Sequence, residues 1–470
     1  MKKKKSKNND YAKSAIIRIC KFVHIVLTIL MYAYCLHYYN SEFNSMRVGS
    51  TRFMIFVALY AAVLCFSLRT YKSYDFGLTD GAMLVYSQSL SNLIAGVVFY
   101  VVFVIANSTL FTPIPLAALL AAQFLLNCVW SFLINRLYFK INKPKKAALI
   151  YSNEQGIQRL SDVYNRKGNF EIIDRIEVSD VDGFSLNVIQ DAEVVFIADL
   201  PARLRNKILE YCIENGKNCF TAPHVGDIIM KGATHMDMFS VPVFNVSRAA
   251  PKIEYAFIKR TIDIVCSLIG IIVLSPLMLI TAVAIMLYDR GPALYKQVRL
   301  TKDGREFKIL KFRSMKVNAE SDGVARLASD NDDRITPVGK IIRACRLDEL
   351  PQLFNILKGD MSIVGPRPER PEIAAQYLDD LPSFNLRLQV RAGLTGLAQV
   401  YGRYNTEPYD KLQMDLMYIN EMSFVKDLRL IFATVKILFV KDSTQGAEGG
   451  KTAAMAKSSE EKTEREVSVK

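Results

Sequence analysis

The adjacent carboxylates Asp348 and Glu349 are the acidic pair best placed for chemistry in this sequence of 470 residues. They follow two arginines, Arg343 and Arg346, at the start of a helix that the sequence predicts from Glu349 to Leu357. A helix N-terminus presents free N–H groups and partial positive charge, which keep a carboxylate ionised and attract phosphate. An ionised aspartate can attack phosphorus, and paired carboxylates can hold Mg²⁺ against a diphosphate. Taken alone, the motif fits ordinary capping of the helix by Asp348 better.

Three basic or glycine-rich motifs favour phosphate chemistry over simple capping. Lys311–Met315 ends a predicted strand with two cations, and Gly365–Pro368 holds an arginine in a rigid turn. Arg391–Gln399, followed by Gly402-Arg403, is a glycine-rich segment with donors suited to a phosphate or a nucleoside. Each motif alone could be structural, but arginine forks match phosphate geometry. Together with the acidic pair, the motifs indicate a site for a phosphorylated substrate.

The positions of histidine and cysteine narrow the chemistry further. All four histidines precede residue 250, so the C-terminal half must work without a Ser-His-Asp triad or a histidine base. The eight cysteines form no CxxC pair and no metal-type spacing. We therefore expect reduced thiols that face the cytosol.

Long apolar segments accompany a strongly basic composition. Hydrophobic residues make up 51% of a chain that also carries 60 lysines and arginines and a net charge of +14. This balance fits anionic lipid and phosphorylated substrates, and we expect no nucleic acid as a partner. Four segments are close to the length of a membrane-spanning helix, and the basic residues flanking them place both ends in the cytoplasm: Ile16–Tyr38, Phe53–Leu68, Leu84–Ile105 and Ile114–Ile134.

A different pattern, of alternating strands and helices, begins after Pro144. The predicted strands are Ala147–Tyr151, Phe170–Ile176, Val194–Ala198 and Val241–Val246, with helices at Ile157–Tyr164 and Arg203–Glu214. The alternation predicts a small parallel, Rossmann-like sheet. The turn Ser152–Gly156 has one glycine and an acidic residue where a pyrophosphate would bind, so we expect a structural or regulatory role rather than nucleotide binding.

The apolar helix predicted at 258–287 is interrupted by Ser275-Pro276. Proline inside a helix removes a hydrogen bond and bends the chain. Basic residues lie on both sides of this helix, and a full span would place the second group outside, against the positive-inside bias. A re-entrant helix that enters and leaves by the same face removes the conflict. A plain fifth span is the alternative.

The remaining elements complete the predicted organisation. Ala293–Leu300 and Glu306–Phe312 flank an Asp303-Gly304 turn and predict a β-hairpin. A helix is expected at Pro337–Ala344, and Leu428–Val440 is amphipathic enough to lie on the membrane. The predicted parts are a four-helix transmembrane region at 1–143, a Rossmann-like domain at 144–250, a membrane-associated, mostly α catalytic domain at 251–442, and a disordered tail at 443–470.

The stretch Lys259–Val440 resembles the bacterial sugar transferase family, the polyprenyl-phosphate phosphoglycosyl transferases that start exopolysaccharide, capsule and O-antigen units. The matching motifs occur in the family's order: Lys259-Arg260 with Asp263, Ser275-Pro276, Lys311–Met315, Leu347–Gln352, Gly359–Ser362 with Val364–Pro368, and Leu394–Gln399 with Gly402-Arg403. The four apolar segments and the middle domain, which is similar to CoA-binding-like domains, resemble the long form of the family. Ala392 departs from the family, which usually has proline there.

The resemblance implies a two-step transfer from a UDP-sugar to undecaprenyl phosphate, the first step in assembling a polysaccharide repeat unit. Asp348 would attack the sugar-bearing phosphorus and release UMP, and the phosphate of the lipid would then attack the phospho-sugar on Asp348. Glu349 would help Asp348 hold Mg²⁺. Arg343 would bind the phosphate of the lipid. The residues implied to surround the nucleotide sugar are Lys311, Arg313, Arg367, Thr395, Gly396, Gln399, Gly402 and Arg403.

The family also implies a location in the bacterial inner membrane, with the catalytic domain at the cytoplasmic face of the bilayer, and the long form suggests a homodimer. Two other functions remain open at this point. The first is direct transfer without a covalent step, with Asp348 only a metal ligand. The second is a non-enzymatic scaffold or regulator of polysaccharide assembly. Glucose and galactose are the commonest sugars in the long form, and the sequence does not separate them.

Overall fold

The computed structural model describes residues 2–43, 49–77, 79, 81–109, 111–153, 156–157, 160–165, 168–178, 184–238, 240–317, 332, 334–402 and 407–437. The chain divides into two compact units, Met1–Ala222 and Pro223–Lys470. The predicted tail at 443–470 and residue Arg403 lie outside the described residues.

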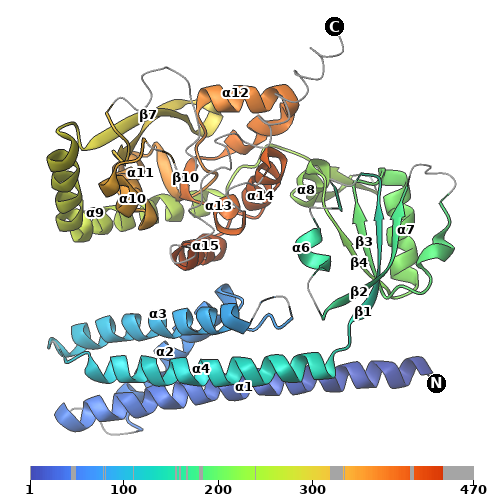
Figure 1. Ribbon diagram of the computed structural model, residues 1–470, viewed down its shortest axis with the longest axis horizontal. Coiled ribbons are helices and arrows are strands. Elements are labelled where there is room, and N and C mark those ends of the chain that lie inside the picture. The colour runs from blue at the N-terminus through green and yellow to red at the C-terminus, as the bar shows by residue number, and fades with distance from the viewer. Residues whose placement is uncertain are drawn as a thin grey trace. The chain divides into compact units, whose positions relative to one another are not determined.

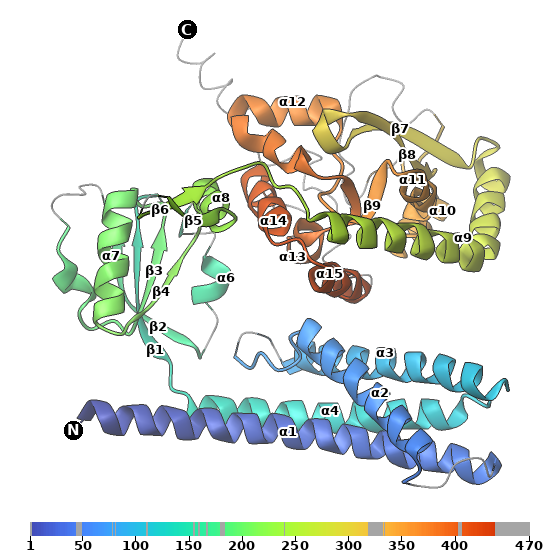
Figure 2. The same ribbon diagram turned by 180° about the vertical axis from the view of Figure 1, so that it is seen from behind.

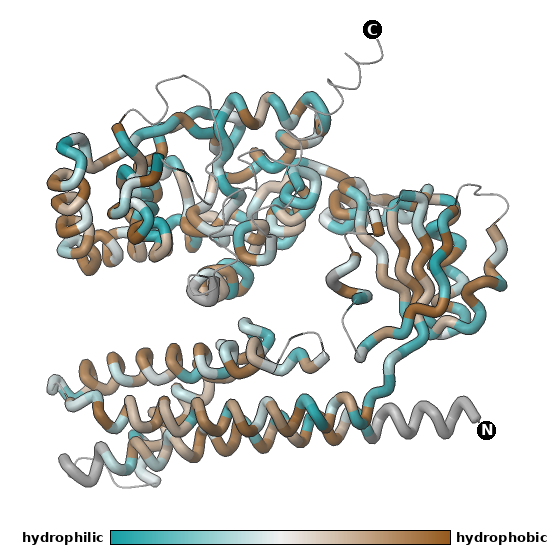
Figure 3. Tube along the Cα trace, viewed as in Figure 1, coloured by the Kyte–Doolittle hydropathy of each residue, from teal (hydrophilic) through white to brown (hydrophobic). Residues whose placement is uncertain are grey.

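Four long apolar helices form the first part of unit Met1–Ala222 and pack alongside one another (Figures 1 and 3). They are α1 (Lys2–Phe43), α2 (Thr51–Thr70), α3 (Gly81–Asn107) and α4 (Ile114–Ile141). Each contains one of the predicted apolar segments, and each is long and apolar enough to cross a membrane. Aromatic side chains fill the core between them; for example, Tyr32 stacks on Tyr60 with ring centroids 3.8 Å apart.

Buried polar side chains also join these helices. The ring of His24 contacts the hydroxyl of Tyr74 at 2.7 Å and the side-chain oxygen of Asn127 at 3.1 Å. The amide nitrogen of Gln123 donates to the hydroxyl of Tyr60 at 3.0 Å. Such interhelical bonds hold apolar helices together where the surroundings offer few other polar partners.

A four-stranded parallel sheet follows in the same unit, in the order β2-β1-β3-β4. The strands are β1 (Lys145–Tyr151), β2 (Phe170–Glu177), β3 (Val194–Ala198) and β4 (Asn218–Thr221). Helix α7 (Ala202–Glu214) packs on one face and α6 (Ser161–Tyr164) on the other (Figure 1). The predicted parallel sheet is therefore confirmed, although the sequence pattern missed the exposed strand β4.

The second unit begins with a short helix that packs on the catalytic part. In α8 (Val225–Lys231), Ile228 is buried in the core that α14 (Pro408–Asn420) helps to form. The amide of Asn420 donates to the carbonyl of Ile228 at 2.7 Å. Residues 223–231 thus pack with the second unit, whereas the sequence pattern places the end of the middle domain at residue 250. The predicted strand at 241–246 forms an exposed antiparallel hairpin, β5 (Thr234–Met238) with β6 (Val241–Asn245), separate from the parallel sheet.

Helix α9 (Ile253–Asp289) contains Pro276, and Figures 1 and 2 show that the helix turns sharply partway along. The hydroxyl of Ser275 donates to the carbonyl of Ile272 at 2.8 Å beside the proline. The first half of α9 is fixed to the rest of the unit by polar side chains. Arg260 donates to the carbonyls of Ile356 and Leu357, each at 2.8 Å.

The rest of the second unit is built around two small strand pairs. The predicted hairpin forms as β7 (Leu294–Leu300) and β8 (Glu306–Phe312), and β9 (Met361–Val364) pairs in parallel with β10 (Ala392–Thr395). The helices of this part are α10 (Pro337–Ala344), α11 (Gln352–Lys358), α12 (Pro371–Asp380), α13 (Leu397–Tyr401), α14 and α15 (Phe424–Ile437), with 3₁₀ turns η3 (Leu347–Glu349) and η4 (Pro382–Gln389). Helix α15 begins four residues before the predicted segment 428–440, whose last three residues lie outside the described part of the chain.

Candidate active site

The acidic pair lies on the 3₁₀ turn η3 rather than in the first turn of a longer helix. Arg346, immediately before the turn, adopts a left-handed conformation with φ 52°. Helix α11 begins only at Gln352, after Pro351. Proline has no N–H to donate to the carbonyl four residues earlier, so α11 starts three residues after the predicted Glu349. The N-cap of η3 is Arg346 and that of α11 is Pro351, so Asp348 does not cap either helix and the capping interpretation is wrong.

Glu349 is surrounded by positive charge. Its Oε1 accepts hydrogen bonds from Lys311 Nζ at 3.4 Å and from Arg367 at 3.2 Å, and its Oε2 lies 3.9 Å from Arg346. Burial alone would raise the pKa of Glu349, but the charges of these three residues lower it to about 2. Burial lowers the pKa of Lys311, an effect that the neighbouring Glu349 opposes. Glu349 is therefore ionised and acts as the counter-ion of this cluster.

Asp348 has a different environment although it is the neighbouring residue. Its side chain makes no hydrogen bond or ion pair with the residues that the structure describes. Burial raises the pKa of Asp348 to about 6, and the charge of Glu349 adds to this effect, while Lys311, Arg343 and Arg346 oppose it. A half-buried carboxylate without hydrogen bonds keeps its lone pairs available for attack. The pair thus combines Glu349, which is held by hydrogen bonds, with Asp348, which accepts none from the described residues.

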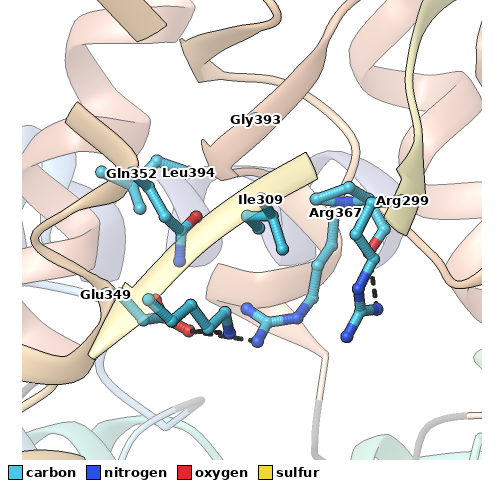
Figure 4. Close-up of a pocket in the computed structure, with 9 residues that line it drawn as sticks. Arg299, Ile309, Glu349, Gln352, Arg367, Gly393 and Leu394 are labelled. Atoms are coloured by element: carbon cyan, nitrogen blue, oxygen red, sulfur yellow. Dashed lines mark hydrogen bonds and ion pairs between the residues drawn. The ribbon is translucent and has the colours of Figure 1, made fainter. Parts of the chain in front are cut away.

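A pocket opens beside this pair, and Figure 4 shows the side chains that line it. Its lining residues are Arg299, Ile309, Lys311, Glu349, Gln352, Arg367, Pro368, Gly393 and Leu394. The structure therefore brings together Lys311, Glu349 and Arg367, three of the residues proposed from the sequence. Asp348 is not among the described lining residues, but it lies next to Glu349 and interacts electrostatically with Lys311.

Two lining residues, Arg299 and Gln352, were missed by the sequence reasoning. Arg299 pairs with Phe307 across the hairpin, and Lys311 pairs with Tyr295, so Arg299 and Lys311 lie on the same face. Strand alternation in the predicted hairpin could have found Arg299. Burial lowers the pKa of Arg299 to about 10, which leaves it charged at neutral pH.

Arg367 is held in place by the backbone of its turn. The N–H of Gly365 donates to the carbonyl of Thr395 at 2.8 Å, and that of Gly393 donates to Pro366 at 2.8 Å. A Cβ atom on Gly393 would lie 2.1 Å from the nitrogen of Gly365, so this approach requires glycine. Behind the turn, buried Arg387 donates to the carbonyl of Arg367 at 2.8 Å and pairs with buried Asp415 at 2.7 Å.

Helix α11, which follows the acidic pair, is fastened to two neighbouring elements. Asn355 donates to the carbonyl of Lys308 at 2.9 Å and accepts from the N–H of Leu310 at 2.9 Å, which ties α11 to β8. Arg260 of α9 binds the carbonyls at the other end of α11. The strand that carries Lys311 and the turn that carries Glu349 are therefore positioned by one helix.

Several residues that the sequence singled out do not line the described pocket. Arg313 is buried, with its guanidinium 3.7 Å from Asp289 at the end of α9 and close to Gly291. Arg343 lies on α10, half-buried, and it lowers the pKa of Asp348. Ser275 and Pro276 lie at the bend of α9, as described above.

The glycine-rich segment Thr395–Gly402 makes close contacts within the second unit. The hydroxyl of Thr395 lies 2.6 Å from that of Thr434 in α15, and the amide of Gln399 donates to the carbonyl of Leu394 at 2.9 Å. A Cβ atom on Gly396 would lie 2.1 Å from the carbonyl oxygen of Gly365. Gly402 ends α13. Arg403, predicted to bind the nucleotide sugar, lies outside the described residues.

The acidic pair is also the group to test for Mg²⁺. The described residues contain no cluster of three or more side chains that could hold a metal by themselves. Mg²⁺ commonly uses one or two carboxylates together with substrate phosphates and water. Asp348, raised in pKa beside the ionised Glu349, fits such a site because a cation would relieve the repulsion between the two carboxylates.

Comparisons with known proteins match the region that carries this site. The profile of the family described as bacterial sugar transferase matches residues 254–441. The UDP-N-acetylgalactosamine-undecaprenyl-phosphate N-acetylgalactosaminephosphotransferase of Aeromonas hydrophila is 46% identical over 191 residues, covering 40% of this chain and 45% of that protein. The UDP-glucose:undecaprenyl-phosphate glucose-1-phosphate transferase of Klebsiella pneumoniae is 43% identical over 190 residues, covering 39% of this chain and 41% of that protein.

In these two relatives, the match spans less than half of their own length. A third relative is covered more completely. The UDP-glucose:undecaprenyl-phosphate glucose-1-phosphate transferase of Caulobacter vibrioides is 41% identical over 198 residues, which are 41% of this chain and 74% of that protein. The residues matched by the family profile include the acidic pair, the hairpin and the Arg367 turn, and the four apolar helices fit the long form that the sequence indicated. The chain belongs to the bacterial sugar transferase family.

Proposed function

We propose that the protein transfers a hexose-1-phosphate from a UDP-sugar to undecaprenyl phosphate, through a covalent intermediate on Asp348. The observation that carries this proposal is the contrast within the acidic pair. Glu349 is bound by Lys311 and Arg367, whereas Asp348 lies half-buried beside it without a hydrogen bond from the described residues. The names of the two relatives described above give a UDP-sugar and undecaprenyl phosphate as their substrates, which supports the same substrate classes here.

In the first step, a carboxylate oxygen of Asp348 attacks the phosphorus that bears the sugar. The bond from that phosphorus to the oxygen bridging the two phosphates breaks, and UMP leaves with the electron pair. In the second step, a phosphate oxygen of the lipid attacks the same phosphorus. The acyl phosphate bond breaks, Asp348 regains its carboxylate, and the product is a lipid diphosphate sugar.

The surrounding residues stabilise charge on the transferred phosphoryl group. Lys311, Arg299 and Arg367 line one pocket, where a diphosphate would bind between them. Glu349 orients Lys311 and Arg367 through its two hydrogen bonds. Mg²⁺ held by Asp348 and Glu349 would supply further neutralisation of the phosphate oxygens. Arg343, on the helix before the pair, is the proposed contact for the lipid phosphate.

The membrane arrangement is part of the same proposal. A re-entrant α9 would keep the second unit at the cytoplasmic face of the inner membrane, where the phosphate of the lipid lies. The bend at Pro276 and the fixation of α11 by Arg260 support this arrangement. The long form of the family suggests a homodimer, which we retain as a proposal.

The test is release of UMP by membranes that contain the full chain, supplied with undecaprenyl phosphate, Mg²⁺ and a panel of UDP-sugars. The panel includes UDP-glucose, UDP-galactose and UDP-N-acetylgalactosamine. We expect release from at least one sugar, and a loss of at least about a thousandfold in Asp348→Ala, because the nucleophile is removed. Equal release by the wild type and Asp348→Ala would contradict the proposal, and so would no release from any sugar.

A further inference from the structure

Gln352 is a buried polar side chain whose partner is missing from the described residues. It is 3% exposed and lines the pocket, on the first turn of α11. Its carboxamide makes no hydrogen bond with the residues that the structure describes. A polar side chain so little exposed, with no partner in the protein, is a candidate to bind a ligand that enters the pocket.

The direction of the carboxamide supports this role. Figure 4 shows it extending into the space that Glu349, Ile309 and Arg367 also face. A polar group of a bound ligand can therefore reach it there. The amide is not sealed within the core, because neither its nitrogen nor its oxygen is among the fully buried atoms without a partner. Gln352 is an open hydrogen-bonding position of this pocket.

The chemistry of a carboxamide narrows the ligand group. A carboxamide offers two donors and one accepting oxygen, and it is neutral. Phosphate oxygens only accept, and they have Arg299, Lys311 and Arg367 as stronger, charged partners in the same pocket. A sugar hydroxyl both donates and accepts, so it can satisfy the oxygen and the nitrogen of the amide. The apolar neighbours Ile309 and Leu394 suit the carbon face of a sugar ring.

The position of Gln352 relative to the acidic pair indicates which part of a nucleotide sugar it contacts. Glu349 directly follows Asp348, and Gln352 comes three residues later. Both side chains line the same pocket. In the proposed reaction, the sugar stays attached to the phosphorus at Asp348 in both steps, while the nucleotide leaves after the first. The group that remains beside η3 throughout is therefore the sugar.

We propose that Gln352 binds a hydroxyl of the transferred hexose and that Gln352, Ile309 and Leu394 form the sugar subsite; this rests on the proposed function. Because Gln352 lies within the motif Leu347–Gln352 that the family shares, the contact holds the sugar beside Asp348 rather than selecting among sugars. It predicts that one hydroxyl of the hexose is recognised by this side chain alone.

The test measures UMP release by the full chain with its best UDP-sugar and with analogues that each lack one sugar hydroxyl. The variants are Gln352→Met, which keeps the volume, and Gln352→Glu, which keeps the shape but removes the donors. We expect Gln352→Met to lower kcat/KM by roughly 10- to 100-fold with the complete sugar. With the analogue that lacks the recognised hydroxyl, kcat/KM of the wild type should fall by a similar factor relative to the complete sugar. Removing the same hydroxyl should lower kcat/KM of Gln352→Met only slightly, because the contact is already absent.

Gln413→Met is the matched control, because Gln413 is a half-buried glutamine of α14 that contacts the backbone of Pro223 outside the pocket. It should leave the ranking of the analogues unchanged. The inhibition constant of UMP should be the same in Gln352→Met as in the wild type. The sugar contact would be overturned if, for every analogue, the losses in kcat/KM caused by Gln352→Met and by the missing hydroxyl multiplied as independent effects. Weaker inhibition by UMP in Gln352→Met would also overturn it. Either result would leave the proposed transfer intact. No UMP release by the wild type would instead overturn the transfer, and the sugar contact with it.

Discussion

Asp348 and Glu349 are neighbours in the sequence, yet their surroundings assign them different tasks. Three cations hold Glu349 ionised, whereas burial raises the pKa of Asp348. Pairs of titratable groups whose environments separate their pKa values are typical of sites that use one group for chemistry and the other for support. In this pair, Asp348 is suited to attack, and Glu349 to holding Lys311 and Arg367.

This assignment predicts a pH dependence for the first chemical step. Asp348 attacks as a carboxylate, so adduct formation from the UDP-sugar should fall as the pH drops through about 6. Bound Mg²⁺ favours the ionised form and would move this midpoint lower. Arg343 lowers the pKa of Asp348, so Arg343→Met should raise the midpoint when Mg²⁺ is kept constant. The measurement is the single-turnover rate of UMP release without lipid, and an unchanged or lower midpoint in Arg343→Met would contradict the assignment.

At the residue scale, the sequence predicted the parts of the site whose signal is local. Asp348, Glu349, Lys311 and Arg367 follow from charged motifs, and the structure places the last three in one pocket. Arg299 could have been found from strand alternation in the predicted hairpin, whereas Gln352 belongs to the pocket only through the packing of its helix. Thr395, Gly396 and Gln399 remain predicted ligand contacts, and they also join β10 and α13 to the Gly365 turn and α15.

At the scale of elements, the Arg367 turn depends on a buried ion pair between η4 and α14. Arg387 and Asp415 are 3% and 1% exposed, and Arg387 also donates to the carbonyl of Arg367. Such pairs often add little stability compared with apolar replacements, but they fix geometry. We therefore regard Arg387 as a positioning residue for Arg367.

The double variant Arg387→Met with Asp415→Leu tests this role. Removing one partner alone should destabilise the protein by about 3–5 kcal/mol, because a charge stays buried. The double variant should recover most of this stability, because Glu369, which lies 3.6 Å from Arg387, keeps Arg299 as a neighbour at 4.0 Å. We expect the double variant to lose about tenfold in kcat/KM, because Arg367 is less well held. Added to Arg367→Met, it should cause little further loss. A folded double variant with wild-type kcat/KM would contradict the positioning role.

The bend in α9 makes a second prediction at this scale. A re-entrant helix places Lys252 and Lys296, which flank it, on the same face of the membrane. In a chain without its native cysteines, Lys252→Cys and Lys296→Cys should both react with an impermeant thiol reagent only from the cytoplasmic side. Ser108→Cys, an exposed position between α3 and α4, should react from the opposite side and serves as the control. Labelling of the first two positions from opposite sides would indicate a plain fifth span.

Element types were predicted better than their limits or partners. The hairpin β7–β8, helix α10 and the parallel sheet agree with local patterns of hydrophobicity and turn residues. The start of α11 and the partner of α8 depend on Pro351 and on long-range packing of Ile228. Patterns along the chain indicate the type of each element, but they indicate its limits and its packing partners only weakly.

At the scale of the whole molecule, the second unit contains every described residue of the proposed site. It begins at Pro223, and α8 contributes Ile228 to its core. The catalytic part should therefore fold without the four apolar helices and the parallel sheet, provided that α8 is kept. The match to the Caulobacter vibrioides relative, which spans most of that protein, is compatible with a self-sufficient catalytic part.

Two truncated proteins test this division. The fragment Pro223–Lys470 should release UMP in membranes at a rate of the same order as the full chain. A fragment that begins at Pro251 loses α8, and burial of a side chain such as Ile228 contributes about 1.5–3 kcal/mol, so its unfolding temperature should fall by several degrees. Equal stability of the two fragments would show that α8 is not part of the catalytic unit, and an inactive but folded longer fragment would assign a catalytic role to the first unit.

The covalent intermediate on Asp348 is the central feature of the proposed mechanism, and the most direct measurement is to trap it. The purified full chain is incubated with Mg²⁺ and a UDP-sugar labelled in the sugar, without lipid, and the labelled peptide is identified by mass. We predict a hexose phosphate on the peptide that contains Asp348, absent from Asp348→Asn and passed to undecaprenyl phosphate when the lipid is added. UMP release and lipid product formed without any labelled protein would contradict the account and favour direct transfer.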